Sequence, residues 1–311
     1  MSHDYALTKI RRSRFIMPVH QKDFVEKAHT RNADAIVLDL EDTVPASEKL
    51  AARNAVKESI PLVLKGGSEV IVRVNHTPDL LEGDLEGAVW PGLGSIYLPM
   101  CESAEDIVNA EKIIARLEEE RGLPPGSVTI NAVIETPRGY LNSEAIARAS
   151  DRIDSISLGN EDFCSVINLV SGPETRNGML AVRMHLLIVA RAHGKIPMGM
   201  IDSMIGFADT AGFEELARLS YKYGFQGSSC MHSSSVDILN RCFSPTAEEA
   251  TAAREVIGVL EDAFAKGEAA AALGGRMIDL VHYNKAKALL ARAELIEAHE
   301  ARKRQAREAA G

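Results

Sequence analysis

The clearest structural signal in the sequence is the stretch Asn131-Ala-Val-Ile-Glu-Thr-Pro-Arg-Gly139. It completes an apolar run over Val128–Ile134, which has the length and β-branched content of a buried strand. The run ends on the carboxylate of Glu135, after which Thr136 can cap a helix and Pro137 suits its first turn. Glu135 is therefore predicted at the carboxyl end of a strand, the edge where a barrel of parallel strands gathers its catalytic groups.

Similar short apolar runs alternate with helical segments along the chain. This alternation predicts an α/β fold, a TIM (β/α)8 barrel over residues 1–245 with a C-terminal helical extension over residues 246–311. The rival interpretation, an open doubly wound sheet, lacks its G-x-G-x-x-G fingerprint after the first strand. The predicted strands are Arg14–Met17, Ala35–Leu38, Val70–Val74, Ser95–Leu98, Val128–Ile134, Ser155–Leu158, Met198–Ile201 and Gly227–Cys230.

Several other segments have distinct patterns. Residues Met1–Arg12 are polar and basic, and we expect a loosely held arm. Ser103, with Asp106 three residues later, has the form of a capping box that opens a long helix. A buried helix is predicted over Leu180–His193, and amphipathic helices over Thr246–Lys266 and Ala286–Ala310.

Composition limits the class of protein. The chain has 311 residues and a formal net charge of −9, which argues against a general nucleic-acid surface because phosphate binding needs a basic stripe. Its four cysteines form no C-x-x-C pair, so we expect reduced thiols. No signal peptide and no apolar run of membrane-span length is visible, and the expected compartment is the cytoplasm, with no membrane partner.

Charged residues recur where the predicted strands end. Glu135 follows the fifth strand, Asp162 follows the sixth, and Arg73 lies in the third. Two facing carboxylates would repel each other unless a cation lies between them, and Mg²⁺ commonly binds one or two carboxylates together with water and substrate oxygens. Arg73 offers a planar fork suited to a substrate carboxylate.

Each of these positions also has a plainer interpretation. An acidic residue after a strand is often only a helix cap or a loop residue. Asp39, Glu41 and Asp42, which follow the second strand, are the most ambiguous. One of them could cap the next helix and another could pair with a cation, whereas four charged strand ends together favour a functional site.

The chain resembles the HpcH/HpaI aldolase and citrate lyase β-subunit-like superfamily. Each matching motif is short, but the set follows the order of that family over nearly the whole chain. The motifs are Arg11-Arg-Ser-Arg14, Leu38-Asp-Leu-Glu-Asp42, Val72-Arg-Val-Asn75, Ile134-Glu-Thr-Pro-Arg-Gly139, Leu158-Gly-Asn-Glu-Asp162, Gly224-Phe-Gln-Gly227 and Gly275-Arg-Met-Ile-Asp279.

The resemblance implies a TIM barrel that assembles as homotrimers or hexamers. It implies Mg²⁺-dependent cleavage of a 3-hydroxyacyl-CoA thioester, such as malyl-, citramalyl- or citryl-CoA, into acetyl-CoA and a 2-keto acid. Glu135 and Asp162 would hold Mg²⁺, and Arg73 would bind the carboxylate of the keto acid. Glu41 and Asp42 would support the water molecules of the metal ion.

The resemblance also gives the C-terminal extension a role. In the CoA lyases an Asp of the tail motif enters the site of a neighbouring subunit as acid or base, and Asp279 matches it. Gly274-Gly275 would act as a flexible hinge. To act as an acid near neutral pH, Asp279 needs a raised pKa, which burial could provide.

Two loops depart from the pattern of the family. Met17-Pro-Val-His20 replaces Val-Pro-Gly after the first strand, near the expected CoA side, so Pro18 is a candidate CoA contact. Arg14 and Arg138 could bind CoA phosphates, although surface ion pairs explain them equally well. In Cys230-Met-His-Ser233, His232 is expected to be a structural hydrogen-bonding residue.

The same residues are compatible with other activities. They are a CoA-independent class II pyruvate aldolase, a malate or citramalate synthase-type enzyme, and a non-catalytic subunit of a citrate-lyase-like complex. The Arg276–Asp279 tail favours the CoA branch over the aldolase. The presence of Glu135, Asp162 and Arg73 argues against a chain without activity.

Overall fold

The computed structural model describes residues 5–170, 172, 174–202 and 209–310 of the chain. The chain divides into two compact units. The first unit comprises residues 1–243 together with residues 303–311, and the second comprises residues 244–302. The unit that contains the barrel therefore also includes residues 303–311, whereas the sequence predicts a separate extension over residues 246–311.

The first unit contains eight parallel strands in the order β7-β6-β5-β4-β3-β2-β1-β8. A bridge between Met198 and Gly227 links the end of β7 to the residue before β8 and closes the sheet into a barrel, as predicted. The strands are β1 (Ser13–Pro18), β2 (Ala35–Asp39), β3 (Glu69–Arg73), β4 (Leu93–Leu98), β5 (Thr129–Ile134), β6 (Ile153–Leu158), β7 (Ile196–Met198) and β8 (Ser228–Cys230).

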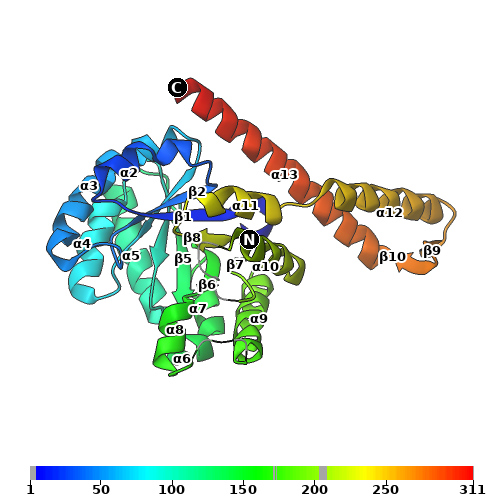
Figure 1. The fold of residues 1–311 in the computed structure, drawn as a ribbon, viewed down its shortest axis with the longest axis horizontal. Coiled ribbons are helices and arrows are strands. Elements are labelled where there is room, and N and C mark those ends of the chain that lie inside the picture. Colours follow the sequence, from blue (N-terminus) through cyan, green and yellow to red (C-terminus); the bar gives the residue numbers. More distant parts are fainter. Residues whose placement is uncertain (1–4, 171, 173, 203–208, 311) are drawn as a thin grey trace. The chain divides into compact units, whose positions relative to one another are not determined.

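Helices alternate with these strands around the barrel (Figure 1). The Ser103 and Asp106 side chains form the predicted capping box at the start of the fifth helix. The helices of this unit are α1 (Tyr5–Thr8), α2 (Lys22–Glu26), α3 (Lys49–Leu64), α4 (Pro78–Ala88), α5 (Ala104–Glu120), α6 (Pro137–Leu141), α7 (Ser143–Arg148), α8 (Asn160–Val166), α9 (Arg176–Ala192), α10 (Thr210–Tyr223) and α11 (Ser234–Cys242), with 3-10 turns η1 (Ala28–Thr30) and η2 (Ala46–Glu48).

The seventh strand lies earlier in the chain than predicted. It covers Ile196–Met198, whereas the apolar run had suggested Met198–Ile201. Gly199 ends the strand, because its φ of 134° is far from an extended conformation. Met200 and Ile201 are still buried, so the run correctly indicated burial but not the strand boundary.

Apolar side chains fill both faces of the strands. Ile36 and Leu38 pack outward into the layer between strands and helices. Val37, between them in β2, belongs to a separate cluster with Ala35, Ile71, Tyr97 and Val133. The two clusters follow the alternation of side chains along a strand. Buried on both faces, the strands show the near-continuous apolar runs from which they were predicted.

Arg11 is fully buried, so the prediction of a loosely held arm up to Arg12 is wrong at its end. The Arg11 guanidinium lies 2.6 Å from Glu69 and 2.6 Å from Asp154, and Lys9 Nζ lies 3.0 Å from the same aspartate. Glu69 begins β3 and Asp154 lies near the start of β6, so this ion-pair cluster ties the N-terminal segment to the strand starts.

A second buried cluster holds the C-terminal end of the chain. Asp34 accepts hydrogen bonds from Arg12 and from Lys303 Nζ, the latter at 2.8 Å. Both Asp34 and Lys303 are fully buried. Arg307 Nη1 donates to Asn32 Oδ1 at 2.7 Å. Residues from 303 onward are therefore attached to the barrel.

The second unit contains α12 (Ala247–Ala265), the antiparallel strands β9 (Ala270–Leu273) and β10 (Arg276–Asp279), and residues 280–302 of α13 (Leu280–Ala310). Gly274 and Gly275 have φ values of 56° and 75°. Positive φ at both central residues is typical of a tight two-residue hairpin turn. The predicted hinge is therefore a turn within a hairpin.

Two findings concern the whole described chain. In its described part, no helix is long and apolar enough to cross a membrane. All four cysteines are buried and free.

Candidate active site

Glu135 follows β5 directly, as predicted. Thr136 caps α6 by accepting a hydrogen bond from the Gly139 N–H, and Pro137 occupies the first helical turn. Glu135 is 7% exposed, and its Oε2 accepts the backbone N–H of Met100 at 2.7 Å. Met100 has a φ of 52°, a left-handed conformation that is uncommon for a residue with a side chain and is often found at functional sites.

Gly159, at the end of β6, leaves room for the Glu135 carboxylate. A Cβ at Gly159 would lie 2.7 Å from Cδ of Glu135 and would overlap its Oε1 and Cγ atoms. Three residues later, Asp162 lies in the first turn of α8 and is exposed. The carboxylates of Glu135 and Asp162 therefore come from adjacent strand ends.

The two carboxylates are electrostatically coupled. Burial, together with a smaller contribution from the charge of Asp162, raises the pKa of Glu135 to about 7. Within the described residues, neither carboxylate forms a salt bridge. A buried carboxylate with a raised pKa beside a second one is a site that a divalent cation would stabilise. The donor set therefore fits Mg²⁺, with most coordination positions left to water and substrate.

Arg73 ends β3 at the centre of an acidic cluster. Its Nε and Nη2 donate to the two carboxylate oxygens of Asp39, both at 2.7 Å. Its Nη1 lies 2.9 Å from Asp42 and 2.8 Å from Glu41. The planar fork predicted to bind substrate thus holds Asp39, and only the Nη1 side is directed toward the other two carboxylates.

The acidic residues after β2 have different environments. Asp39 is fully buried and also accepts hydrogen bonds from the backbone N–H groups of Glu41 and Thr43. Although its burial opposes ionisation, the hydrogen bonds and charge of Arg73 lower the pKa of Asp39. Burial raises the pKa of Glu41 to about 8 despite the nearby Arg73. Asp42 is the exposed member of the group.

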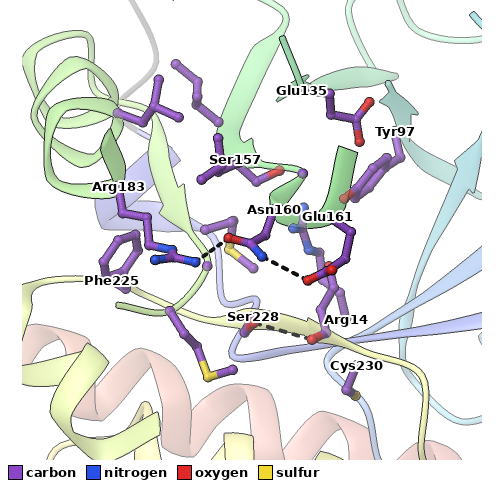
Figure 2. Close-up of a pocket in the computed structure, with 18 of the residues that line it drawn as sticks. Arg14, Tyr97, Glu135, Ser157, Asn160, Glu161, Arg183, Phe225, Ser228 and Cys230 are labelled. Carbon is purple, nitrogen blue, oxygen red and sulfur yellow. Dashed lines mark hydrogen bonds between the residues drawn. The ribbon is translucent and has the colours of Figure 1, made fainter. Parts of the chain in front are cut away.

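A cavity of about 370 Å³ joins these groups. Figure 2 shows Glu135 near Tyr97, with Arg14 and Glu161 around the same pocket. The lining includes Glu135, Asp162, Arg73 and Asp42, so the structure brings together most of the predicted site residues. Glu41 does not line this cavity, although it contacts the same Arg73 nitrogen as Asp42.

Comparison with known proteins identifies the family. A family model described as HpcH/HpaI aldolase/citrate lyase matches residues 12–233. This chain belongs to that family. It is 34% identical over 290 residues to the citrate lyase subunit beta of Escherichia coli strain K12, covering 93% of this chain and 95% of that protein.

Two other family relatives extend the comparison. The L-malyl-CoA/beta-methylmalyl-CoA lyase of Cereibacter sphaeroides strain ATCC 17025 is 30% identical over 301 residues, covering 88% of this chain and 91% of that protein. The crystal structure of CitE from Mycobacterium tuberculosis, in complex with magnesium, acetoacetate and coenzyme A, aligns with a TM-score of 0.72. It is 26% identical, and the alignment covers 91% of this chain and 97% of that one.

The residues predicted to contact CoA lie in different places. Arg14 is 1% exposed and lines the cavity inside the barrel, so the surface ion-pair interpretation is wrong for this residue. Pro18 ends β1 and is half-buried, and Arg138 is exposed on α6. His232 forms the expected local hydrogen bond, with Nδ1 2.6 Å from the Ser234 hydroxyl.

Asp279 lies in the second unit, at the end of β10. Its Oδ1 lies 2.7 Å from His282 Nδ1 and accepts the backbone N–H of Val281 at 3.1 Å, which caps the start of α13. The hydrogen bond with His282 lowers the pKa of Asp279. In the single chain this carboxylate therefore lacks the raised pKa that an acid role requires.

The sequence analysis missed several residues that line the cavity. Asn160, which begins α8, accepts a short hydrogen bond from Arg183 and donates to Glu161 at 2.9 Å (Figure 2). Arg183 was overlooked because it lies inside an otherwise apolar helical pattern. A single charged residue on the buried face of a predicted helix is the sequence signal that could have identified Arg183 as a site residue.

Proposed function

We propose that this chain is a Mg²⁺-dependent carbon–carbon lyase that cleaves a 3-hydroxyacyl-CoA thioester into acetyl-CoA and a 2-keto acid. The observation that carries the proposal is the pairing of Glu135 and Asp162 in the same cavity as Arg73. The relatives support it: one is named for its action on malyl-CoA, and the CitE structure contains magnesium, acetoacetate and coenzyme A.

The residues of the cavity have distinct proposed roles. Glu135 and Asp162 would hold Mg²⁺, which supplies Lewis-acid polarisation of the substrate oxygens when bound. Arg73 would present Nη1 to the carboxylate of the keto acid, while Asp39 holds the other side of its guanidinium. Asp42 lines the cavity and would accept the hydroxyl proton, and Glu41 would help to position Arg73 through its contact with Nη1.

The substrate hydroxyl loses its proton to the Asp42 carboxylate, and its C–O bond becomes the C=O bond of the keto acid. The electron pair of the broken C–C bond forms the enolate of acetyl-CoA. A carboxylic acid then protonates the enolate carbon to give the methyl group of acetyl-CoA.

We propose that Asp279 of an adjacent subunit is this acid, in a homotrimer or hexamer. In the single chain its pKa is lowered by His282, so packing against a neighbour would have to break that hydrogen bond and bury the carboxylate. Mixed oligomers of Asp279→Ala and Glu135→Gln subunits, each inactive alone, should regain activity. No recovery in verified mixed oligomers would contradict the role in trans.

The CoA moiety is proposed to enter at the strand ends. Pro18 ends β1 at this edge and Arg138 is exposed on the helix that follows Glu135, so both are candidate contacts for the CoA chain or its phosphates. The four free cysteines suit a reducing compartment, and we propose the cytoplasm.

The relationship to citrate lyase subunit beta favours a second candidate, in which the chain works only within a multi-subunit complex. Size-exclusion chromatography of the protein made alone, combined with an activity assay, separates the two. An active homo-oligomer supports the first candidate. A homo-oligomer that stays inactive until other subunits are added supports the second.

A substrate panel tests the proposed function. Malyl-, citramalyl-, β-methylmalyl- and citryl-CoA should be supplied in the cleavage direction, with Mg²⁺ or with EDTA. In the other direction the matching keto acids should be supplied with propionyl-CoA for β-methylmalyl-CoA and with acetyl-CoA for the other three. At least one thioester should be cleaved in the presence of Mg²⁺ and none with EDTA. Cleavage or condensation of keto acids without any CoA thioester would indicate a CoA-independent aldolase instead.

A further inference from the structure

Arg14 is a buried cation, and two of its guanidinium nitrogens have no hydrogen-bond partner in the described part of the chain. It lies near the start of β1, is 1% exposed, and lines the cavity of the active site. Its Nε and Nη1 atoms are buried and make no hydrogen bond to any described residue. Arginine stays charged in proteins, and an uncompensated buried charge is costly. Burial correspondingly lowers the pKa of Arg14 from its ordinary value.

Two hydroxyl groups in the same cavity also lack a hydrogen-bond partner among the described residues. Ser157 on β6 and Ser229 on β8 line the cavity, and their buried Oγ atoms form no hydrogen bond within the described chain. The Tyr97 ring centroid lies 5.0 Å from the Arg14 guanidinium carbon, so the cation has an aromatic neighbour. Asp154 and Glu69 also act on Arg14 electrostatically, but both are salt-bridged to Arg11, and among the described residues no carboxylate forms a salt bridge with Arg14. Figure 2 shows Arg14, Tyr97 and Ser157 around one pocket. A guanidinium and two hydroxyls directed into one cavity form a donor set for a small anion.

We propose that Arg14, Ser157 and Ser229 bind a second carboxylate on the substrate, so that the keto acid formed by this enzyme is dicarboxylic. The inference rests on the proposed function, in which Mg²⁺ and Arg73 bind the 2-keto acid end of the molecule. The cavity volume of about 370 Å³ is small for a ligand pocket and suits a short dicarboxylate.

This assignment gives Arg14 a different ligand from the CoA phosphates predicted from sequence. Arg14 is almost completely enclosed, and its surroundings include the apolar side chain of Ile16 and the Tyr97 ring. The phosphates of CoA are bulky, carry several charges and stay hydrated, so burying them in this cavity would cost more than burying one carboxylate.

The test compares oxaloacetate with pyruvate in condensation with acetyl-CoA. Arg14→Met should lower kcat/KM for oxaloacetate by about 10- to 100-fold and change the value for pyruvate by less than about threefold, because only oxaloacetate has a second carboxylate. Ser157→Ala and Ser229→Ala should each lower the oxaloacetate value by about three- to tenfold. Ser228→Ala is the matched control, since the Ser228 hydroxyl lines the same cavity but already donates to a backbone carbonyl.

Equal losses for both keto acids in the Arg14→Met variant, or a wild-type preference for pyruvate, would overturn the proposal. A rise in KM for acetyl-CoA with unchanged keto-acid selectivity would assign Arg14 to CoA instead. The variant should fold, because replacing an unpaired buried charge with an apolar side chain is often neutral or stabilising. A melting temperature of Arg14→Met equal to or above that of wild type would confirm that the variant folds.

A binding measurement separates this inference from the proposed function. With Mg²⁺ present, malate should raise the melting temperature of the wild-type protein more than lactate does, and Arg14→Met should remove the difference. If no CoA thioester reacts but this Arg14-dependent difference persists, the function is wrong and the subsite stands. If thioesters react but malate and lactate behave alike, the function stands and the subsite is wrong.

Discussion

Replacing Glu135 with glutamine should stabilise the metal-free protein at alkaline pH. The pKa of Glu135 is raised from 4.5 to about 7, chiefly by burial, so the folded state binds its proton more tightly than the unfolded state. Folding is therefore penalised when this carboxylate is ionised, and the penalty grows as pH rises from 4.5 to about 7. Glutamine removes the charge and keeps an oxygen that can accept the Met100 N–H.

The size of the effect follows from the pKa change. One pKa unit corresponds to about 1.4 kcal/mol, so the full penalty is about 3 kcal/mol above pH 7. At about pH 5.5 most of the folded-state carboxyl groups are protonated, and the penalty falls to about 1 kcal/mol. Glu135→Gln should therefore exceed wild type in unfolding free energy by about 3 kcal/mol at about pH 8.5 and by about 1 kcal/mol at about pH 5.5.

Urea unfolding without metal, followed at both pH values, measures this difference. Glu144→Gln is the matched control, because it removes the same charge from an exposed helix position and should change stability by less than about 0.5 kcal/mol. Mg²⁺ should stabilise wild type and not Glu135→Gln. A destabilised Glu135→Gln variant at alkaline pH, or equal Mg²⁺ stabilisation of both proteins, would refute the reasoning.

Three other predictions follow from the same geometry. Arg73→Lys should lower kcat/KM by more than about tenfold, because lysine cannot hold both oxygens of one carboxylate, and steady-state kinetics that match wild type would contradict this. Gly159→Ala should weaken Mg²⁺ binding at least about tenfold without unfolding the barrel, since its Cβ would displace the Glu135 carboxylate; unchanged calorimetric affinity would argue against the metal site. The salt bridge with Arg11 lowers the pKa of Asp154, so the stabilisation by the Asp154 carboxylate is present above about pH 4 and is lost as the pH falls. In acid titrations of the unfolding free energy, wild type should therefore lose stability relative to Asp154→Asn. Parallel stability curves for the two proteins would contradict the pairing.

The fold could be predicted largely because a closed parallel barrel buries both faces of its strands. Each strand then becomes an apolar run that can be read locally, as in Ala35–Leu38. The sequence-based predictions are wrong where the tertiary structure overrides the local sequence pattern. The β9–β10 hairpin was missed because Ala270–Leu273 has little strand propensity, and only the Gly274-Gly275 pair indicated a turn.

The site was predictable where it depends on topology and unpredictable where it depends on distant partners. Glu135, Asp162, Arg73 and Asp42 meet because the ends of parallel strands converge on one mouth. The burial of Arg11 depends on Asp154, which lies 143 residues away, so a charged N-terminal segment read alone suggests a solvated arm. Side chains alternate between the two faces of a strand, so Arg14 lies on the same inner face of β1 as Ile16. This two-residue spacing is the sequence signal that places Arg14 in the cavity.

The most direct test of the central claim is the stoichiometry of the products. The best substrate among malyl-, citramalyl- and citryl-CoA should be incubated with the purified protein, and acetyl-CoA, keto acid and free CoA should be quantified together. We predict equal amounts of acetyl-CoA and 2-keto acid, formation that stops with EDTA and resumes with Mg²⁺, and a severe loss in Glu135→Gln. Release of free CoA without acetyl-CoA, or product formation that EDTA does not affect, would contradict a Mg²⁺-dependent carbon–carbon lyase.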